Sequence, residues 1–163
     1  MHDEPSVLAL LSELGIEHHT VHHAPVHTVA EAKAVRTSEE RGHVKNLFLR
    51  DRKRRMWLVT LLEDRAVDLA TLRARLGASS GFGFASHDRL REVLGVEPGS
   101  VTPMAAVNDV QGVVTVVLDA AIRDLPEVHC HPLHNAATTR MSPGGLVRLL
   151  RHTGHEPVWL ELA

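Results

Sequence analysis

The sequence predicts a single compact α/β domain of the α+β type, in which helices surround a mixed, mostly antiparallel sheet. The chain has 163 residues, which suits one hydrophobic core and leaves little for a second. Hydrophobic residues make up 44% of the chain and charged residues 23%, an ordinary globular balance. Segments patterned as hairpin strands are interspersed with segments of helical periodicity. We therefore treat residues 1–163 as one domain.

The first part of the chain predicts a helix, a strand and a second, short helix. Residues 6–14 carry valine and leucine at helical spacing, with a glycine directly after them. Residues 16–22 alternate loosely in polarity, which is typical of a short strand. Thr28 and Glu31 match a capping box, so a short helix through Val35 is expected there.

The middle of the chain predicts a hairpin and two capped helices. Apolar strands are expected over residues 44–50 and 56–62, joined by a short polar tip at residues 51–55. Asp68 and Ser86 are suitable N-caps for the two helices that follow. A glycine comes after each helix, as is typical of a left-handed C-cap.

The last part of the chain predicts three strands and a helix. Residues 99–103 have turn chemistry and are expected to form a loop. A continuous β-branched run at residues 113–118 favours a central strand, and residues 128–131 are a shorter candidate. The Ser-Pro pair at residues 142–143 is typical of a helix start. Residues 158–162 close the chain as a strand.

The composition excludes several classes of protein. A single cysteine excludes an intramolecular disulfide framework and fits a reducing compartment. The formal net charge of −2 argues against a uniformly basic nucleic-acid binder, although a local basic patch remains open. No apolar stretch is long enough for a membrane span, and the acidic start lacks signal-peptide features. The expectation is a cytoplasmic protein with no membrane partner.

Two features could carry chemistry. Lys45 begins an apolar strand and shares a face with Leu47 and Leu49 by the two-residue repeat. A lysine on such a face is costly unless it meets an anion or lines a cleft, and the alternative is that it extends to water. The loop at residues 99–103 could offer backbone N–H groups to a carbonyl or carboxylate oxygen. The alternative for this loop is a plain connecting turn.

Two histidine-rich segments could bind metal, but another interpretation is favoured for each. Residues 129–135 could hold zinc or use Cys130 as a nucleophile, but the spacing matches no known ligand pattern. A single histidine that donates one hydrogen bond in a pocket is favoured there. The second group could be a metal-binding or acid-sensing patch, yet an exposed strand and loop is favoured. Its members are His18, His19, His22, His23 and His27. We predict no metal site and no cofactor.

The polar hairpin tip is strongly basic. It is either a solvated turn or a surface that binds phosphates and releases counterions. The candidates for phosphate contact are Arg50, Arg52, Lys53, Arg54 and Arg55. Nearby arginines could extend this surface, namely Arg73, Arg75, Arg89 and Arg91. The absence of tyrosine makes base stacking on a sheet platform a poor expectation.

Five segments in the same order resemble one known family. They contain Lys-Asn-Leu-Phe-Leu, a Gly-x-x-x-Pro loop and a His-Pro-Leu motif. The segments are residues 24–32, 42–51, 94–103, 108–109 and 131–138. Nearly the whole chain is similar to the free-standing prolyl-tRNA editing domains of the YbaK/ProX superfamily, most closely to their Ala-tRNA(Pro) deacylase branch. His27 departs from the pattern, because the family often has Phe there.

The resemblance implies a compact α/β hydrolase that cuts the ester between alanine and the terminal ribose of tRNA(Pro) and excludes proline by size. The implied partners are the acceptor end of aminoacyl-tRNA(Pro) and, as a further candidate, prolyl-tRNA synthetase. The implied catalytic group comprises Lys45, Asn46, Gly99, Ser100, Val101 and Thr102. The implied substrate contacts are Thr28, Val29, Leu47, Pro103, His131 and Asn135.

The roles expected from this resemblance are specific. Lys45 would stabilise the ester carbonyl or the terminal phosphate, and the N–H groups of residues 100–102 would stabilise the oxyanion. Asn46 and His131 would orient the substrate by hydrogen bonds. Two alternatives stay open: a related deacylase for Cys- or Ser-charged tRNA, and a non-catalytic protein that binds tRNA or metal.

Overall fold

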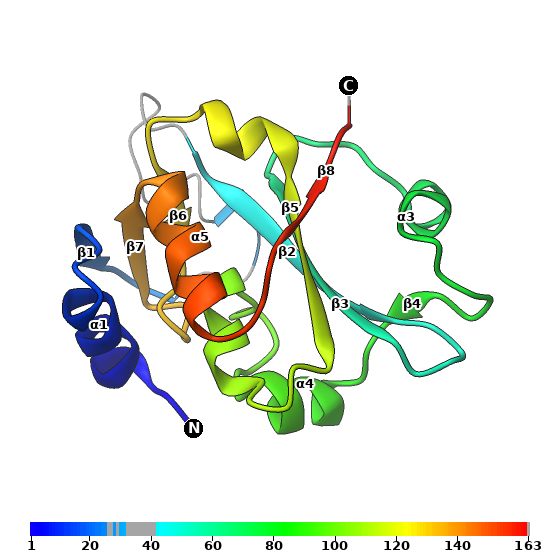
Figure 1. Cartoon of the computed structure of the whole chain (residues 1–163), viewed down its shortest axis with the longest axis horizontal. Coiled ribbons are helices and arrows are strands. Elements are labelled where there is room, and N and C mark those ends of the chain that lie inside the picture. The colour runs from blue at the N-terminus through cyan, green and yellow to red at the C-terminus, as the bar shows by residue number, and fades with distance from the viewer. Residues whose placement is uncertain (26–27, 29, 32–41, 163) are drawn as a thin grey trace.

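The structure is a computed structural model that describes residues 1–25, 28, 30–31 and 42–162 (Figure 1). Runs of consecutive strands, such as β1 to β3, are interspersed with helices along this part of the chain, which agrees with the α+β class. In chain order they are α1 (Glu4–Glu13), β1 (His18–His22), β2 (Val44–Arg50), β3 (Met56–Leu62), α3 (Leu69–Leu76), β4 (Gly83–Phe84), α4 (His87–Leu94), η1 (Pro103–Asn108), β5 (Val114–Asp119), η2 (Ala120–Asp124), β6 (Val128–Cys130), β7 (Ala137–Met141), α5 (Pro143–His152) and β8 (Val158–Leu160).

The larger sheet has five strands in the order β4-β2-β3-β5-β8. The β2–β3 hairpin is antiparallel and has the bounds that the sequence predicts, whereas β3, β5 and β8 run parallel to one another. Parallel strands end at the same edge of a sheet, and an antiparallel neighbour begins there. The start of β2 therefore lies beside the carboxyl ends of β3, β5 and β8.

A second, three-stranded sheet has the order β1-β7-β6 and is antiparallel throughout. Its central strand β7 was not anticipated. Because β7 pairs with β1 and β6, the strands form two sheets where we expected one. The two sheets meet at a parallel bridge between His43 and His129. The combination of parallel and antiparallel pairing agrees with the predicted α/β class of α+β type.

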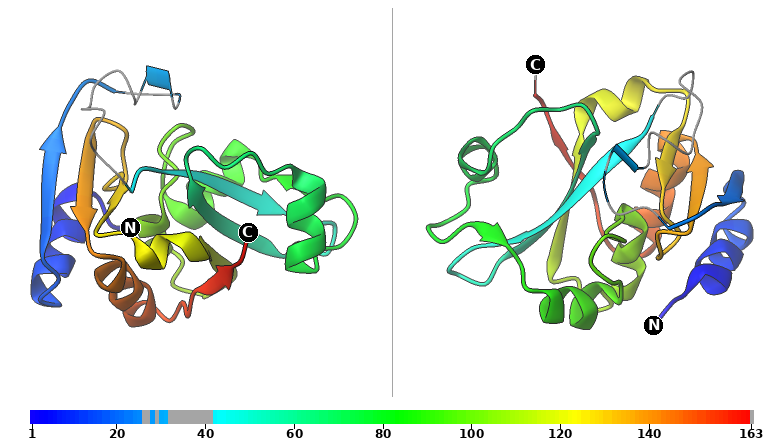
Figure 2. Two further views of the ribbon diagram at one scale, coloured as in Figure 1. Left: turned by 90° about the horizontal axis from the view of Figure 1, so that it is seen from above. Right: turned by 180° about the vertical axis from the view of Figure 1, so that it is seen from behind.

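Two hydrophobic cores stabilise this arrangement. The larger core includes Leu58 and Val116 on one face of the five-stranded sheet, together with α4, α5 and η1. The smaller core includes Leu49 and Trp57 on the other face, beneath Leu72 of α3. Figure 2 shows α3 at one end of the molecule, and α1 with the three-stranded sheet at the other.

Local capping signals account for the helix boundaries. Asp68, Ser86 and Ser142 accept hydrogen bonds from backbone N–H groups of the helices that they precede. Glycines in the left-handed region end α3 and α4. The Asp3 capping box starts α1 two residues earlier than the sequence periodicity predicts. In the described part of the chain, no helix is long and apolar enough to cross a membrane.

The helix expected after Thr28 falls largely outside the described residues. The N–H of Glu31 donates to the Thr28 hydroxyl at 3.0 Å, which is the cap contact that the sequence predicts. Residues 30 and 31 are helical, and Val35 lies outside the described part. The described portion therefore agrees with a helix start at this point.

Candidate functional site

The junction of the two sheets brings the best-supported site residues together. The rings of His43 and His129 stack there with centroids 4.2 Å apart. Their bridge is parallel, and Lys45 and His131 each follow it by two residues. Alternate residues of an extended chain share a face, so Lys45 lies on the side of His43, and His131 on the side of His129. The predicted lysine and histidine thus leave the same junction on the same side.

A glycine makes this junction possible. Gly42 has a φ of +86°, and an added Cβ would lie 2.0 Å from the backbone oxygen of Glu127. The carbonyl of Gly42 also accepts a hydrogen bond from the N–H of His129 at 3.0 Å. A side chain here would separate the sheets, because backbone atoms cannot yield as a flexible side chain can.

Lys45 is half-buried, and its ammonium donates to the backbone carbonyl of Arg65. Leu47 lies on the same face and packs against the smaller core, as the two-residue repeat predicts. An ammonium has three N–H donors, so the bond to Arg65 leaves two for a ligand. The start of β2 therefore presents an ammonium group that a hydrogen bond to the backbone holds in place.

Two residues that the sequence argument missed support this cation. The guanidinium of Arg65 donates to both carboxylate oxygens of the fully buried Asp119, at 2.8 and 3.2 Å. Burial by itself would raise the pKa of Asp119, but the bonds from Arg65 and from two backbone N–H groups hold the pKa below its usual value. Both residues lie at the edge where Lys45 begins its strand. Because Arg65 and Asp119 lie far apart in the sequence, no local pattern indicated this contact.

Asn46 faces the opposite side of the sheet from Lys45. The buried hydroxyl of Thr60, directly across the hairpin, donates to its side-chain oxygen at 2.7 Å. This bond holds the side chain of Asn46 against the sheet and uses one of the two lone pairs of its oxygen. The structure thus separates two neighbours that the resemblance groups together.

The loop predicted to stabilise the oxyanion offers fewer available N–H donors than expected. The N–H of Ser100 donates to the carbonyl of Glu97 at 3.0 Å, which removes it from the predicted set. The N–H groups of Val101 and Thr102 make no hydrogen bond within the described residues. Thr102 and Pro103 are buried at the start of η1, and Gly99, the first residue of the loop, adopts a φ of +89°.

No hydrogen bond within the described ranges joins this loop to Lys45 or His131. Val101 packs against the larger core, whereas Leu47 packs against the smaller one. The predicted catalytic and substrate-contact residues are therefore spread over both faces of the sheet. Of the others, Thr28 is exposed, Asn135 is half-buried and Val29 lies outside the described residues.

His131 is held as a neutral acceptor. Its Nδ1–H donates to the carbonyl of Ala137 at 3.1 Å, because a carbonyl can only accept. Burial lowers the pKa of His131, and the bond to Ala137 opposes that shift. With the proton on Nδ1, the Nε2 lone pair is free to accept a hydrogen bond.

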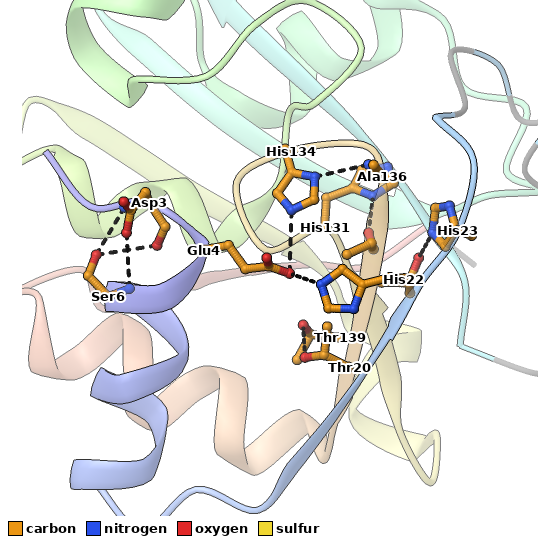
Figure 3. Close-up of polar contacts among 12 residues, drawn as sticks. Asp3, Glu4, Ser6, Thr20, His22, His23, His131, His134, Ala136 and Thr139 are labelled. Atoms are coloured by element: carbon orange, nitrogen blue, oxygen red, sulfur yellow. Dashed lines mark hydrogen bonds and ion pairs between the residues drawn. The ribbon is translucent and has the colours of Figure 1, made fainter.

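A carboxylate links the segments around His131. Figure 3 shows Glu4 between His22 and His134. The Oε1 atom of Glu4 lies 2.8 Å from Nε2 of His22 and 3.4 Å from Nε2 of His134. The N–H of Ala136 donates to Nδ1 of His134 at 3.1 Å, which leaves the proton of that ring on Nε2. These contacts connect α1 and β1 to the loop that carries His131.

The histidines do not assemble into a metal centre in the part of the chain that the structure describes. No group of three or more His, Cys, Asp or Glu side chains there could hold a metal ion. His18 and His23 instead bond separately to backbone carbonyls, at 2.8 Å each. His27 lies outside the described residues. Cys130 is buried in the larger core, and burial raises its pKa to about 12, so its thiol is a poor nucleophile.

The basic hairpin tip contains one internal ion pair. Asp51 is fully buried and accepts bonds from Arg55 and from the N–H of Ser79. Burial would raise the pKa of Asp51, but these bonds hold it far below its usual range. Arg55 also lies over the ring of Trp57, at 5.5 Å from the centroid. Arg55 is therefore largely committed to the fold.

The other four predicted cations of the tip are exposed. They are Arg50, Arg52, Lys53 and Arg54. Asp51 at the tip follows Lys45 by six positions of extended chain, which corresponds to roughly 20 Å. A duplex could reach from one to the other, because its backbone presents phosphates along that whole length.

Comparison with known proteins gives one consistent family. The aminoacyl-tRNA editing domain family matches residues 23–149. The chain is 39% identical to prolyl-tRNA synthetase associated domain-containing protein 1 of Bos taurus, over 92% of this chain and 90% of that protein. It is 36% identical to the prolyl-tRNA editing protein ProX of Acetoanaerobium sticklandii, over 99% of both chains.

Solved structures show the same fold. The hypothetical protein APE2540 aligns with a TM-score of 0.73 at 22% identity, over 93% of this chain and 96% of its own. A structure described as a candidate trans-editing enzyme for prolyl-tRNA synthetase aligns with a TM-score of 0.68 at 21% identity, over 100% and 99%. These two alignments extend the family match to the three-dimensional arrangement of the strands and helices.

Proposed function

The chain belongs to the aminoacyl-tRNA editing domain family, and on that premise we propose that it hydrolyses the ester of mischarged tRNA(Pro), with alanine as the amino acid removed. Relatives whose names refer to prolyl-tRNA editing and to prolyl-tRNA synthetase support this choice of tRNA. The partner is the acceptor end of the tRNA, and prolyl-tRNA synthetase is a further candidate. We expect the reaction to take place in the cytoplasm, where tRNA is charged.

The observation that carries the proposal is the held ammonium of Lys45. An aminoacyl ester is already activated, so water can attack it without a protein nucleophile. The attack places negative charge on the carbonyl oxygen, and a nearby cation stabilises that charge more than it stabilises the neutral ester. Two free N–H donors on Lys45 can meet this oxygen or the terminal phosphate.

The remaining groups have supporting roles in the proposed reaction. Unpaired N–H groups of Val101 and Thr102 are suitable donors to the oxyanion. The Nε2 of His131 can accept a hydrogen bond from the substrate's ammonium or ribose hydroxyl. Water forms the new C–O bond, the bond to the ribose oxygen breaks, and that oxygen takes a proton. The products are free alanine and intact tRNA.

Size is the simplest basis for sparing the correct product. Proline carries a ring that alanine lacks, and steric overlap rejects a larger ligand effectively. A site sized for alanine discriminates less well against serine and cysteine, which differ from it by one heavy atom. We expect Val29, Leu47 and His131 to set that size.

The direct test is a deacylation assay on Ala-, Cys-, Ser- and Pro-tRNA(Pro). We expect hydrolysis of Ala-tRNA(Pro) and survival of Pro-tRNA(Pro). Lys45→Ala should lower the rate by about 10²-fold or more, the loss typical of removing one oxyanion donor. Arg151→Ala, which removes an exposed ion pair between Arg151 of α5 and Glu156, is the matched control and should keep the wild-type rate.

Each other outcome of this assay contradicts a defined part of the proposal. Faster release of cysteine or serine would identify a related deacylase. Binding of tRNA without hydrolysis of any ester would indicate a non-catalytic protein. Full activity of Lys45→Ala would remove the lysine from the mechanism.

A further inference from the structure

We propose that Arg65 and Asp119 are positioning residues that hold the ammonium of Lys45 through the backbone carbonyl of Arg65. The inference rests on the proposed function only in treating Lys45 as the catalytic cation. Neither residue touches the substrate in this scheme. Their role is to fix the place from which Lys45 acts.

The sheet topology brings the three residues to one edge. Lys45 is in register with Leu61 near the end of β3, and Thr60 is in register with Leu118 near the end of β5. Asp119 is the last residue of β5, and Arg65 follows β3 by three residues. The start of the antiparallel strand β2 and the ends of the parallel strands β3 and β5 therefore meet at the same edge of the five-stranded sheet.

Both carboxylate oxygens of Asp119 accept hydrogen bonds, from donors in three segments of the chain. Besides Arg65, it accepts from the N–H of Leu62 at 3.2 Å and from the N–H of Ala121 at 3.1 Å. Its side chain is completely buried. A buried carboxylate with four donors has one stable orientation, because losing any of them leaves charge poorly compensated.

Arg65 is correspondingly immobile. All three of its guanidinium nitrogens donate, two of them to Asp119 and Nη1 to the carbonyl of Leu162 at 2.7 Å. Its own N–H donates to the carbonyl of Leu62 at 3.0 Å, which closes the turn after β3. Its carbonyl is then left pointing at Lys45, whose Nζ donates to it.

The energetics favour a positioning role over a stabilising one. A buried ion pair gains little net stability, because the desolvation of two charges offsets their attraction. Such a pair does fix geometry, since a bidentate guanidinium–carboxylate contact permits few arrangements. A catalytic cation benefits from this, because a displacement of about 1 Å at a reacting centre can cost about 10²-fold in rate.

The activity test uses substitutions that keep the side chains nearly the same size. Asp119→Asn removes the charge, and Arg65→Lys keeps the charge but loses the forked contact. Each should lower the kcat for Ala-tRNA(Pro) by about 10- to 10²-fold while KM changes little. Glu161→Gln is the control, because Glu161 makes an exposed ion pair with Arg123 at the same edge of the sheet and should leave kcat unchanged.

A double substitution separates positioning from general structural damage. In a Lys45→Ala background, Asp119→Asn should cause no further loss of kcat, because the cation that it positions is gone. Multiplicative losses in the double variant would overturn the inference. A wild-type kcat for Asp119→Asn and for Arg65→Lys would do the same.

A spectroscopic readout makes the test independent of activity. The chain has three lysines, so NMR of ¹⁵N-lysine-labelled protein can resolve the side-chain ammonium of Lys45. We expect a slowly exchanging ammonium signal that Asp119→Asn weakens and Glu161→Gln leaves intact. An unchanged signal in folded Asp119→Asn would overturn the inference. If the wild-type protein hydrolysed no aminoacyl-tRNA while these NMR changes occurred, the proposed function would fail and the positioning pair would stand.

Discussion

Replacing Gly42 with alanine should open the junction between the two sheets. The residue has a φ of +86°, a region in which a side chain costs about 1–2 kcal/mol. Its new Cβ would lie 2.0 Å from the oxygen of Glu127. Real Cβ contacts essentially never fall under 3.0 Å, so the backbones must separate by the difference, 1.0 Å.

That separation has a predictable cost. It would stretch the 3.0 Å hydrogen bond from the N–H of His129 to the carbonyl of Gly42, which is worth about 1 kcal/mol. It would also part the stacked rings of His43 and His129. With the backbone strain, we expect Gly42→Ala to lower the free energy of unfolding by about 3 kcal/mol.

Gly154 provides a matched control. Its φ is +82°, nearly that of Gly42, but nothing lies within 4 Å of an added Cβ. Gly154→Ala should therefore cost only the backbone strain, about 1–2 kcal/mol. Urea unfolding of the two variants, followed by tryptophan fluorescence, measures the difference that arises from the contact with Glu127.

The same substitution should also reduce activity. Lys45 and His131 each follow the junction by two residues, so a 1 Å opening displaces them relative to one another. Gly42→Ala should thus slow deacylation, and Gly154→Ala should not. Equal stability losses in the two variants would refute the steric account of Gly42.

Three further predictions follow from the site. Arg52→Ala should reduce the slope of log K against log salt for tRNA binding by about 1, and Arg151→Ala should leave it unchanged; equal slopes for the two variants would exclude the hairpin tip from the interface. Burial lowers the pKa of His131 below 6.5. If deacylation needs the neutral form of His131, the kcat should therefore be constant above pH 6.5 and fall only at lower pH. The contribution of His131 to stability should likewise be complete above pH 6.5 and be lost as the pH drops through its lowered pKa; a kcat profile that falls already above pH 6.5 would contradict this. Native protein should resist alkylation at Cys130 at pH 8, and Cys130→Ala should keep its deacylation rate, whereas rapid labelling would show that the thiol is accessible.

Local elements were predictable because their causes are local. The β2–β3 hairpin has the predicted bounds, since a polar tip between two apolar runs leaves little choice of register. The caps at Asp68 and Ser86 lie where predicted, because a side chain satisfies N–H groups only two or three residues away.

Other elements carry weak local signals. β7 (Ala137–Met141) is short and contains an arginine and two threonines, and it becomes a strand by pairing on both sides with β1 and β6. The bridge that joins the sheets at His43 and His129 depends on segments 86 residues apart. No periodicity in either segment indicates that contact.

The sequence by itself determined the class of fold, the resemblance to an editing domain, and the individual residues Lys45 and His131 as candidates. These follow from patterns and motifs that are contiguous in the chain. Only the tertiary structure decided that these two residues share one side of a junction while Asn46 faces the other. It also decided that the carbonyl of Arg65 accepts a hydrogen bond from Lys45 while the guanidinium of Arg65 binds Asp119. The physical reason is that strand order and direction determine which ends meet at an edge, and those depend on pairings between distant segments.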